Sequence, residues 1–319
     1  MSFKPLSPHP VLIPPPDLTP WCSSSLGIPY VHERDSGRPG PEILISSLVH
    51  GNEYCGAWAL DAFLRTGIVP RRGRITTVFC NVAALERFDI RQPDLSRYVD
   101  EDFNRVWSIE CLNGSGNSTE LKRAREIRPL VERATFLLDM HSMHEPGPPL
   151  LVTGLLDRNL RLAQSLKTGY QAVVDAGHTD GVRLTDFGAF SSPTGEQVAL
   201  GLEVGQHWEE SSPKVAKDVL MRFLIFCDVL SLDDVPAGWL QPDAEAPLPV
   251  TVTHRIVARS MEFRFVQNFV GGEVIPAAGS VIAFDGSNPV TTPYDNCVLV
   301  MPSVRQLRPG VTTVRLGRR

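Results

Sequence analysis

The sequence has little of what marks membrane, exported or nucleic-acid-binding proteins. No apolar run approaches the length needed to span a bilayer. The proline-rich residues 1–20 show no export signal, in which a basic stretch precedes an apolar one. No block of lysine and arginine recurs with interleaved aromatic residues, and the net charge of −5 is mild. We therefore expect neither a membrane nor a nucleic acid as a partner.

The chain also lacks paired cysteines. In a chain of this size without an export signal, scattered cysteines are expected to stay reduced, which predicts a cytoplasmic protein. No Cys-x-x-Cys motif occurs among the six cysteines, which are Cys22, Cys55, Cys80, Cys111, Cys227 and Cys297.

Length and periodicity predict two domains. The chain of 319 residues is long enough for a large core, and up to residue 235 short apolar strands alternate with amphipathic helices. This order predicts an α/β domain over residues 1–235, a doubly wound mixed sheet with helices on both faces, with an extended arm at residues 1–25. A linker rich in Pro and Asp follows, and residues 250–319 are expected to form a smaller all-β domain that covers the site.

Two early strands are predicted to be neighbours. Residues 28–33 and 42–49 flank the turn sequence Asp-Ser-Gly-Arg-Pro-Gly. Gly and Pro at these positions are typical of a tight reversal. We therefore expect a hairpin-like loop between the two strands.

A histidine and a carboxylate follow the second of these strands. His50 and Glu53 lie in the turn just past its carboxyl end, where ligands collect in open α/β sheets. Three residues apart on one turn, both side chains can point at a single metal ion. His-x-x-Glu also arises by chance, and a lone histidine beside a core strand is more often a packed, hydrogen-bonded residue. Cys55, close by in sequence, is a weaker alternative ligand.

Two later strands also end at an ionisable residue. The apolar run of residues 135–140 ends at His141, and the run of residues 198–202 ends at Glu203. Parallel strands of one sheet would place these residues along the same edge as His50 and Glu53. Two histidines and one carboxylate make a catalytic zinc shell that leaves a position for water. Glu203 is then placed to act as the base, or alternatively to cap a helix as a buried carboxylate.

A long polar loop covers residues 86–107. It carries several arginines and is too irregular for a strand or a helix. Long loops within compact domains are often functional, although a solvated surface loop is the alternative. The helix that follows, residues 119–133, has Glu120 in its first turn, where an acidic side chain suits the helix dipole.

Four segments together resemble a known family. They are His-Gly-Asn-Glu at residues 50–53, Arg-Tyr-Val-Asp-Glu-Asp-Phe-Asn-Arg at 97–105, Leu-Asp-Met-His at 138–141 and Gly-Leu-Glu-Val-Gly at 201–205. These look like the signature segments of the succinylglutamate desuccinylase/aspartoacylase family, and they occur in the family's order. The resemblance implies a zinc carboxypeptidase-like catalytic domain followed by a β domain.

The resemblance also assigns roles to residues of the site. His50, Glu53 and His141 would bind one Zn²⁺ ion per chain, and Glu203 would transfer the proton. Asp139, two residues before His141, would orient His50 or His141 from behind.

Three residues of the polar loop would bind substrate. The resemblance implies that Arg97 faces the developing oxyanion. Asn104 and Arg105 would bind the substrate's carboxylate, for which a guanidinium fork is suited. Simple ion pairs of Arg97 and Arg105 with Asp100 or Asp102 are the alternative.

Two further residues are candidates. Tyr294, on a turn of the C-terminal region, would reach into the site as the tyrosine of the family's β domain does. His144 could serve as a further donor behind the metal ligands.

These features predict a zinc-dependent amidohydrolase that cleaves a small N-acyl amino acid or a related carboxylate-bearing amide. A metallocarboxypeptidase, a non-catalytic protein that binds a small anion, and a structural zinc protein are the alternatives. The family's arginine shortly before the Gly-x-Glu-Val-Gly segment is missing, because residues 187–202 contain none and the nearest upstream is Arg183. The identity of the amino acid and of the acyl group stays open, as does self-association into a homo-oligomer.

Overall fold

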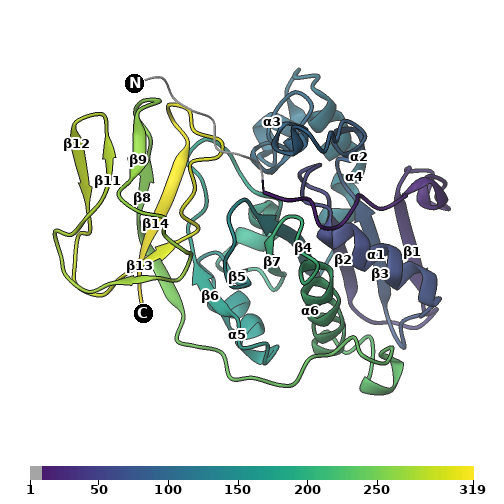
Figure 1. Ribbon diagram of the computed structural model, residues 1–319. Helices are drawn as coiled ribbons and strands as arrows, with labels where there is room; N and C mark the ends of the chain where they lie inside the picture. The colour runs from purple at the N-terminus through teal and green to yellow at the C-terminus, as the bar shows by residue number, and fades with distance from the viewer. Residues whose placement is uncertain (1–8) are drawn as a thin grey trace.

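The structure, a computed structural model, describes residues 9–319. The first part of the predicted arm, residues 1–8, lies outside the described residues. A mixed sheet of eleven strands runs through the molecule in the order β1-β3-β2-β4-β7-β5-β6-β8-β14-β13-β10 (Figure 1). Its first seven strands are β1 (Val31–Asp35), β2 (Glu42–Ser47), β3 (Arg74–Phe79), β4 (Phe136–Met143), β5 (Leu150–Val152), β6 (Gln171–Val174) and β7 (Val198–Gln206).

Helices cover both faces of this part of the sheet (Figure 1). Neighbouring residues of β2 point to opposite faces, because side chains alternate along a strand. Ile43 and Ile45 join the apolar cluster that includes α1, α5 and α6, whereas Leu44 joins the cluster of α4. The predicted doubly wound α/β fold is therefore confirmed. The helices are α1 (Cys55–Thr66), α2 (Val82–Leu85), α3 (Ile109–Asn113), α4 (Thr119–Arg133), α5 (Asp157–Ser165) and α6 (Ser212–Phe226).

The predicted hairpin between the first two strands is wrong. β3 lies between β1 and β2, and it pairs antiparallel with β1 and parallel with β2. The side chains of β2 are buried on both faces of the sheet, which favours parallel neighbours on both sides, while the partly exposed β1 takes the sheet edge. The turn instead binds the start of β3, since Gly73 N donates to Arg38 O at 3.0 Å.

The strands that carry the candidate site are parallel and adjacent. β4 pairs with β2 on one side and with β7 on the other. In this register His141 lies opposite Glu203. Both strands continue beyond these residues, to Met143 and Gln206, so the two side chains lie inside the strands and not at their last residues.

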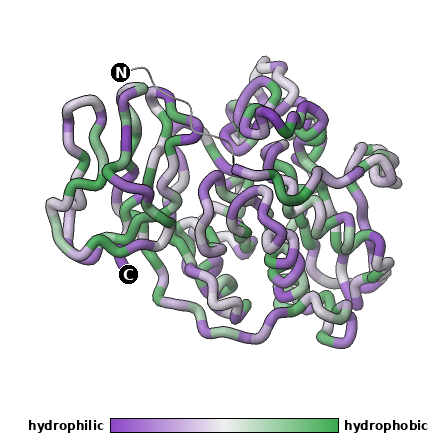
Figure 2. Tube along the Cα trace, viewed as in Figure 1, coloured by the Kyte–Doolittle hydropathy of each residue, from purple (hydrophilic) through white to green (hydrophobic). Residues whose placement is uncertain are grey.

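The C-terminal strands extend the same sheet. β8 pairs parallel with β6, and β14, β13 and β10 continue antiparallel from β8. A separate small antiparallel sheet consists of β9, β11 and β12. Apolar residues recur along these strands (Figure 2). Their bounds are β8 (Val250–Val257), β9 (Phe263–Phe265), β10 (Val274–Ile275), β11 (Val281–Asp285), β12 (Asn288–Thr291), β13 (Cys297–Val300) and β14 (Thr312–Arg318).

The described part of the N-terminal arm is held by backbone contacts with the α/β layer. Leu12 N donates to Trp208 O at 3.1 Å. The Tyr54 hydroxyl donates to Ile13 O, and Trp58 Nε1 donates to Pro14 O. Among the helices of residues 9–319, none combines the length and the apolar character that crossing a bilayer requires.

Candidate metal centre

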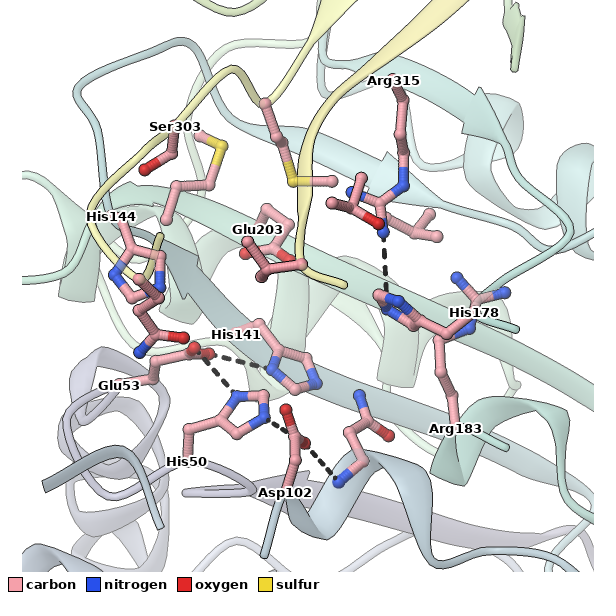
Figure 3. A pocket seen from close by; sticks show the side chains of 18 of the residues that line it. His50, Glu53, Asp102, His141, His144, His178, Arg183, Glu203, Ser303 and Arg315 are labelled. Atoms are coloured by element: carbon pink, nitrogen blue, oxygen red, sulfur yellow. Dashed lines mark hydrogen bonds and ion pairs between the residues drawn. The ribbon is translucent and has the colours of Figure 1, made fainter. Parts of the chain in front are cut away.

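Three metal-competent side chains converge at the carboxyl edge of the parallel strands (Figure 3). His50 and Glu53 come from the turn after β2, and His141 comes from β4. Their ligand atoms lie within 4.8 Å of one another, and all three residues are buried. The structure therefore brings the predicted ligand set together.

The turn after β2 depends on two unusual backbone positions. Leu48 has a φ of 57°, a left-handed conformation that a branched aliphatic residue rarely adopts. Gly51 packs against backbone, because a Cβ there would lie 2.4 Å from Ala84 C and 2.5 Å from Ser96 O. Only glycine allows the turn to sit this close to the following segments, and this contact sets the direction of His50 and Glu53.

Each histidine turns one nitrogen inward and binds a carboxylate with the other. His50 Nδ1 and His141 Nδ1 each lie 2.9 Å from an oxygen of Glu53. His50 Nε2 lies 3.0 Å from Asp102 Oδ1, and His141 Nε2 lies 2.7 Å from Asp139 Oδ2. A carboxylate behind each ring fixes the tautomer and aims the inner nitrogen, as is usual for metal-binding histidines.

The donor set fits a metal ion. His50 Nδ1 is buried and makes no hydrogen bond with residues 9–319, although it faces Glu53. Two imidazole nitrogens and a carboxylate are donors that zinc accepts at about 2.0–2.2 Å. A divalent cation would satisfy the orphaned nitrogen and hold the negative charge of Glu53.

The charges of the cluster support one another. Burial opposes ionisation of Glu53, but His50, His141 and Arg97 outweigh it and hold the pKa of Glu53 well below its ordinary value. Burial likewise opposes a charge on His141, but Asp139 and Glu53 raise its pKa well above the ordinary value. The centre therefore favours a positive charge at the inner nitrogens, and protons and metal ions compete for that place.

Glu203 is a partly buried acid that lines the cavity. Its Oε2 has no hydrogen-bond partner within the described residues. Burial raises the pKa of Glu203 to about 8, with the charge of His141 opposing this shift and that of Glu53 adding to it. A carboxyl group with such a pKa can both accept and release a proton near neutral pH.

The polar loop is tied down by Glu120. This carboxylate is fully buried and accepts the backbone N–H groups of Val99, Asp100 and Glu101 at 2.7, 3.1 and 3.3 Å. Asn81 Nδ2 donates to it as well, at 2.8 Å. We expected Glu120 only to suit the helix dipole. Its main contacts are instead these hydrogen bonds, which hold the polar loop against the edge of the sheet.

The loop brings Arg97, Asn104 and Arg105 to the same cavity. Arg97 donates to Glu53 Oε1 at 2.8 Å and lies 3.4 Å from Asp102 Oδ2. Arg105 lies 3.8 Å from Asp102 Oδ1, so both arginines also make the ion pairs that were the alternative expectation. Asn104 is buried, and its Oδ1 accepts Leu184 N. Its amide nitrogen makes no hydrogen bond with residues 9–319 and can bind another partner.

The cavity has a volume of about 450 Å³ and two different sides. Figure 3 shows His178, Arg183 and Arg315 on one side, His144 and Ser303 on the other, and the metal-competent cluster between them. Residues of the C-terminal region also line it, among them Met301, Pro302, Val311 and Arg315.

Tyr294 does not reach this cavity. Its turn precedes β13, towards the outer edge of the sheet, and its hydroxyl contacts the Thr253 hydroxyl at 2.5 Å. The guanidinium of Arg318 stacks 3.8 Å above its ring. The prediction that Tyr294 binds substrate is therefore wrong. The pairing of the C-terminal strands places this side chain beside Thr253 and Arg318, outside the cavity.

Cys55 is not a ligand either. Its thiol donates to the carbonyl oxygen of His207, and burial raises the pKa of Cys55 to about 12. A thiol with this pKa does not offer the thiolate that a metal needs.

Sequence reasoning missed four cavity residues. Asp102, His178, Arg183 and Arg315 line the cavity, and none of them was predicted to do so. Asp102 was visible within the arginine loop motif, but only as an ion-pair partner. Arg315 could have been found, because it is a charged residue between the apolar Val314 and Leu316 of a strand, and a charge buried at such a place needs a partner.

The fold and the site define an α/β protein with a metal-competent cluster at the carboxyl edge of its parallel strands. Residues 39–216 match the family described as Succinylglutamate desuccinylase/Aspartoacylase catalytic domain. The chain belongs to this family, as the resemblance of its motifs implied.

Related proteins include amidohydrolases. The chain is 30% identical over 237 residues to an N-acyl-aromatic-L-amino acid amidohydrolase (carboxylate-forming) of Xenopus tropicalis, covering 69% of this chain and 70% of that protein. It is 32% identical over 133 residues to a probable aspartoacylase of Parasynechococcus marenigrum, covering 38% of this chain and 41% of that protein. The match to the N-acyl-aromatic-L-amino acid amidohydrolase (carboxylate-forming) of Xenopus laevis covers 44% of the length of that protein.

Solved structures show the same fold. A succinylglutamate desuccinylase/aspartoacylase from Rhodobacter sphaeroides superposes with a TM-score of 0.63 at 16% identity, covering 88% of this chain and 86% of that one. The ectoine utilization protein EutE of Ruegeria pomeroyi also has a TM-score of 0.63, at 18% identity and with the same coverage. At these identities the likeness concerns the fold.

Proposed function

We propose that the protein is a zinc-dependent amidohydrolase that cleaves a small N-acyl amino acid or a related carboxylate-bearing amide. One observation carries the proposal: the inner nitrogens of His50 and His141, the carboxylate of Glu53 and the unpartnered carboxyl of Glu203 share one cavity. Membership of a family whose relatives are amidohydrolases supports it.

The residues of the cavity would divide the work as follows. His50, Glu53 and His141 would hold the zinc ion, which supplies a Lewis acid for the amide carbonyl and lowers the pKa of water. Glu203 would take a proton from the attacking water and pass it to the leaving nitrogen. The water oxygen then bonds to the carbonyl carbon, the carbon–nitrogen bond breaks, and a carboxylate and an amine result.

Two sets of side chains would bind and stabilise the substrate. Arg97, from the polar loop, would face the negative charge that develops on the carbonyl oxygen. Asn104 and Arg105 would hold the carboxylate of the amino acid part. Residues of the C-terminal region also line the cavity, and its volume of about 450 Å³ favours a small amide over a long peptide.

The decisive variant is Glu203→Gln. It keeps the shape of the side chain but cannot accept a proton, so kcat/KM should fall by about a hundredfold or more. Zinc content, measured by elemental analysis, should stay near that of the wild type because Glu203 is not a ligand. Glu210→Gln, an exposed residue after β7, is the matched control and should change neither quantity.

The outcomes separate the alternatives. Glu203→Gln that holds zinc and still hydrolyses at the wild-type rate would show that the mechanism is wrong. A wild-type protein with clearly less than about one zinc per chain after metal-replete purification would favour the non-catalytic anion-binding protein. Faster cleavage of short peptides than of N-acyl amino acids would favour the metallocarboxypeptidase.

The cysteines support a reducing compartment, and we propose a cytoplasmic location. All six are free, with Cys22 and Cys111 exposed and the others buried. Native protein isolated from its own cells should therefore show reactive thiols at both exposed positions. Mass spectrometry that finds these positions oxidised in a disulfide would contradict the location.

A further inference from the structure

We propose that Asp180 is a positioning residue for Arg105: it holds the guanidinium in the direction in which it binds the substrate. The inference rests on the proposed function, in which Arg105 holds the carboxylate of the amino acid part. Asp180 lines the cavity from the segment after β6, outside the four signature motifs. Because Asp180 acts through Arg105, its loss should weaken substrate binding without slowing the chemical step.

The two side chains are in direct contact. Arg105 Nε donates to Asp180 Oδ1 at 3.1 Å, and Arg105 Nη1 donates to the backbone oxygen of Asn104 at 2.9 Å. These two bonds fix the plane of the guanidinium. No hydrogen bond joins Nη2 of Arg105 to any residue of 9–319. The contact with Asp180 therefore orients the group and leaves Nη2 for the substrate, and a planar guanidinium suits a carboxylate.

The backbone beside Asp180 packs directly against Arg105. Val182 N donates to Arg105 O at 3.2 Å, and Trp107 N donates to Val182 O at 3.3 Å. A Cβ at Gly181 would lie 2.4 Å from Arg105 O and 2.6 Å from Arg105 Cβ, so glycine is needed for this approach. The side chain of Asp180 thus starts from main chain whose place relative to Arg105 is fixed.

The segment after β6 is itself anchored to the C-terminal strands. Nε of Arg315 in β14 donates to Asp175 Oδ2 at 2.8 Å, and Nη1 of Arg255 in β8 donates to Gly177 O at 2.5 Å. β8 and β14 are neighbours in the large sheet. The position of Asp180, a few residues further along the chain, is thereby tied to this sheet.

A second carboxylate competes for the same guanidinium. Asp102 Oδ1 lies 3.8 Å from Arg105 Nη1 and 3.0 Å from His50 Nε2. Opposite charges attract more strongly as they approach, so Arg105 without Asp180 should move towards Asp102. It would then lose its direction towards the substrate and compete with His50 for the carboxylate of Asp102. Asp180 balances this attraction from the other side.

The ion pair should contribute little to folding stability. The side chain of Asp180 is 63% exposed and that of Arg105 is 19% exposed. Exposed ion pairs stabilise proteins only weakly. Variants of Asp180 should therefore fold normally, and a change in their kinetics reports the direction of Arg105.

Steady-state kinetics of Asp180→Ala test the proposal. A panel of N-acetyl-L-alanine, N-acetyl-L-phenylalanine, N-acetyl-L-glutamate and N-acetyl-L-lysine first identifies the compound that the wild type cleaves fastest. On this compound KM should rise about fivefold or more and kcat should stay within about twofold, because the weakened contact binds ground state and transition state alike. Partial unfolding would instead lower the apparent kcat at an unchanged KM. Asp180→Asn, which can still accept from Arg105 Nε, should raise KM less.

Two controls isolate the contact. Asp228→Ala removes an exposed ion pair with Arg72, at 2.8 Å and outside the cavity, and should leave KM unchanged. In a protein that already carries Arg105→Gln, Asp180→Ala should raise KM no further, because its effect passes through Arg105.

Three results would overturn the positioning role and leave the proposed function standing. The first is an unchanged KM in Asp180→Ala. The second is a lower KM, which would mean that Asp180 blocks the substrate. The third is a full further rise of KM in the Arg105→Gln background, which would mean that Asp180 acts by another route.

Failure of the proposed function would look different, because the wild type would then cleave none of the four compounds. The contact is tested in that case with phenylglyoxal, a reagent for arginine, and mass spectrometry of the modified protein. Asp180 shields the guanidinium of Arg105 and helps to keep it protonated, so Arg105 should react faster in Asp180→Ala than in the wild type. Equal rates would overturn the positioning role.

Discussion

Glu203 lies beside His141 with one carboxyl oxygen buried and without a hydrogen-bond partner in residues 9–319. Water stabilises an ionised carboxylate, and the interior around Glu203 offers little in its place. The same burial that costs stability leaves the group ready to exchange a proton near neutral pH. Stability and reactivity are therefore in conflict at this residue.

This conflict predicts a pH dependence of stability. The pKa of Glu203 is about 8 in the folded protein and 4.5 ordinarily, so its stabilising contribution is complete below 4.5 and is lost as the pH rises through 8. Glu203→Gln stays neutral, and its stability advantage over the wild type should grow between pH 5 and 8. Urea unfolding of both zinc-free proteins measures this difference. An advantage that stays constant over this range would contradict the assigned pKa.

Glu120 is the second residue whose loss should have a large effect. Glu120→Ala leaves the N–H groups of Val99, Asp100 and Glu101 without their acceptor, and we expect a destabilisation of about 3 kcal/mol or more. The freed loop carries Arg97 and Arg105. We therefore expect kcat/KM to fall even for the fraction of the variant that stays folded.

Urea unfolding and amide hydrogen exchange at the loop measure the effect of Glu120→Ala. The control is Glu126→Ala on the same helix, an exposed residue whose ion pair with Arg123 should contribute little. If the loop amides exchange equally slowly in wild type and Glu120→Ala, Glu120 does not hold the loop.

Among the residues of the site, the contacts that could be predicted join residues close together in the sequence. His50 and Glu53 share one turn, and Asp139 lies two residues from His141, so a short sequence pattern carries their relation. The link between His50 and Asp102 spans 52 residues and needs the loop's folded path. Tyr294 was assigned by resemblance alone, and the side it faces depends on the register of strands that no local pattern specifies.

At the scale of elements, the turn after β2 sets the whole centre. Its glycine is required by a close backbone approach and not by a left-handed φ. Gly51→Ala should therefore displace the turn from the backbone near Ala84, lower the melting temperature markedly and reduce the zinc content. Gly37→Ala is the control, since Gly37 has a φ of 69° and nothing within 4 Å of its added Cβ.

The two glycine variants separate sterics from backbone preference. Gly37→Ala should cost only about 1 kcal/mol, the usual penalty of a left-handed alanine, and should leave zinc binding intact. Thermal melting and elemental analysis measure both effects. Equal losses in the two variants would show that the tight packing at Gly51 is unimportant.

Element order was predictable where periodicity decides it, and pairing was not. The runs at β2, β4 and β7 are apolar on both faces, so buried parallel strands were the natural expectation. The position of β1 was mispredicted because a turn signal indicates a reversal but not the partner of the returning chain. β3 is inserted between β1 and β2 by a later crossover that the turn does not encode.

At the scale of the whole molecule, the division into two domains is crossed by continuous structure. β8 adds to the edge of β6, and one apolar cluster joins both parts of the chain. It contains Met143, Leu150, Val173, Val250, Val298 and Val300. The ion pair between Asp175 and Arg315 crosses the same boundary. The predicted boundary near residues 235–250 therefore marks a linker in the sequence, while the sheet and the cavity extend across it.

This continuity predicts that the α/β part is not independent. A chain that ends at residue 240 would expose the edge of β6, the apolar side chains of Met143, Leu150 and Val173, and the buried Asp175 without Arg315. An open strand edge beside apolar residues promotes association between chains. We expect this truncated protein to aggregate or to lack a cooperative thermal transition, whereas the full chain melts as one unit. Circular dichroism melting and gel filtration test this, and a monomeric truncated protein with a sharp transition would show that the α/β layer folds on its own.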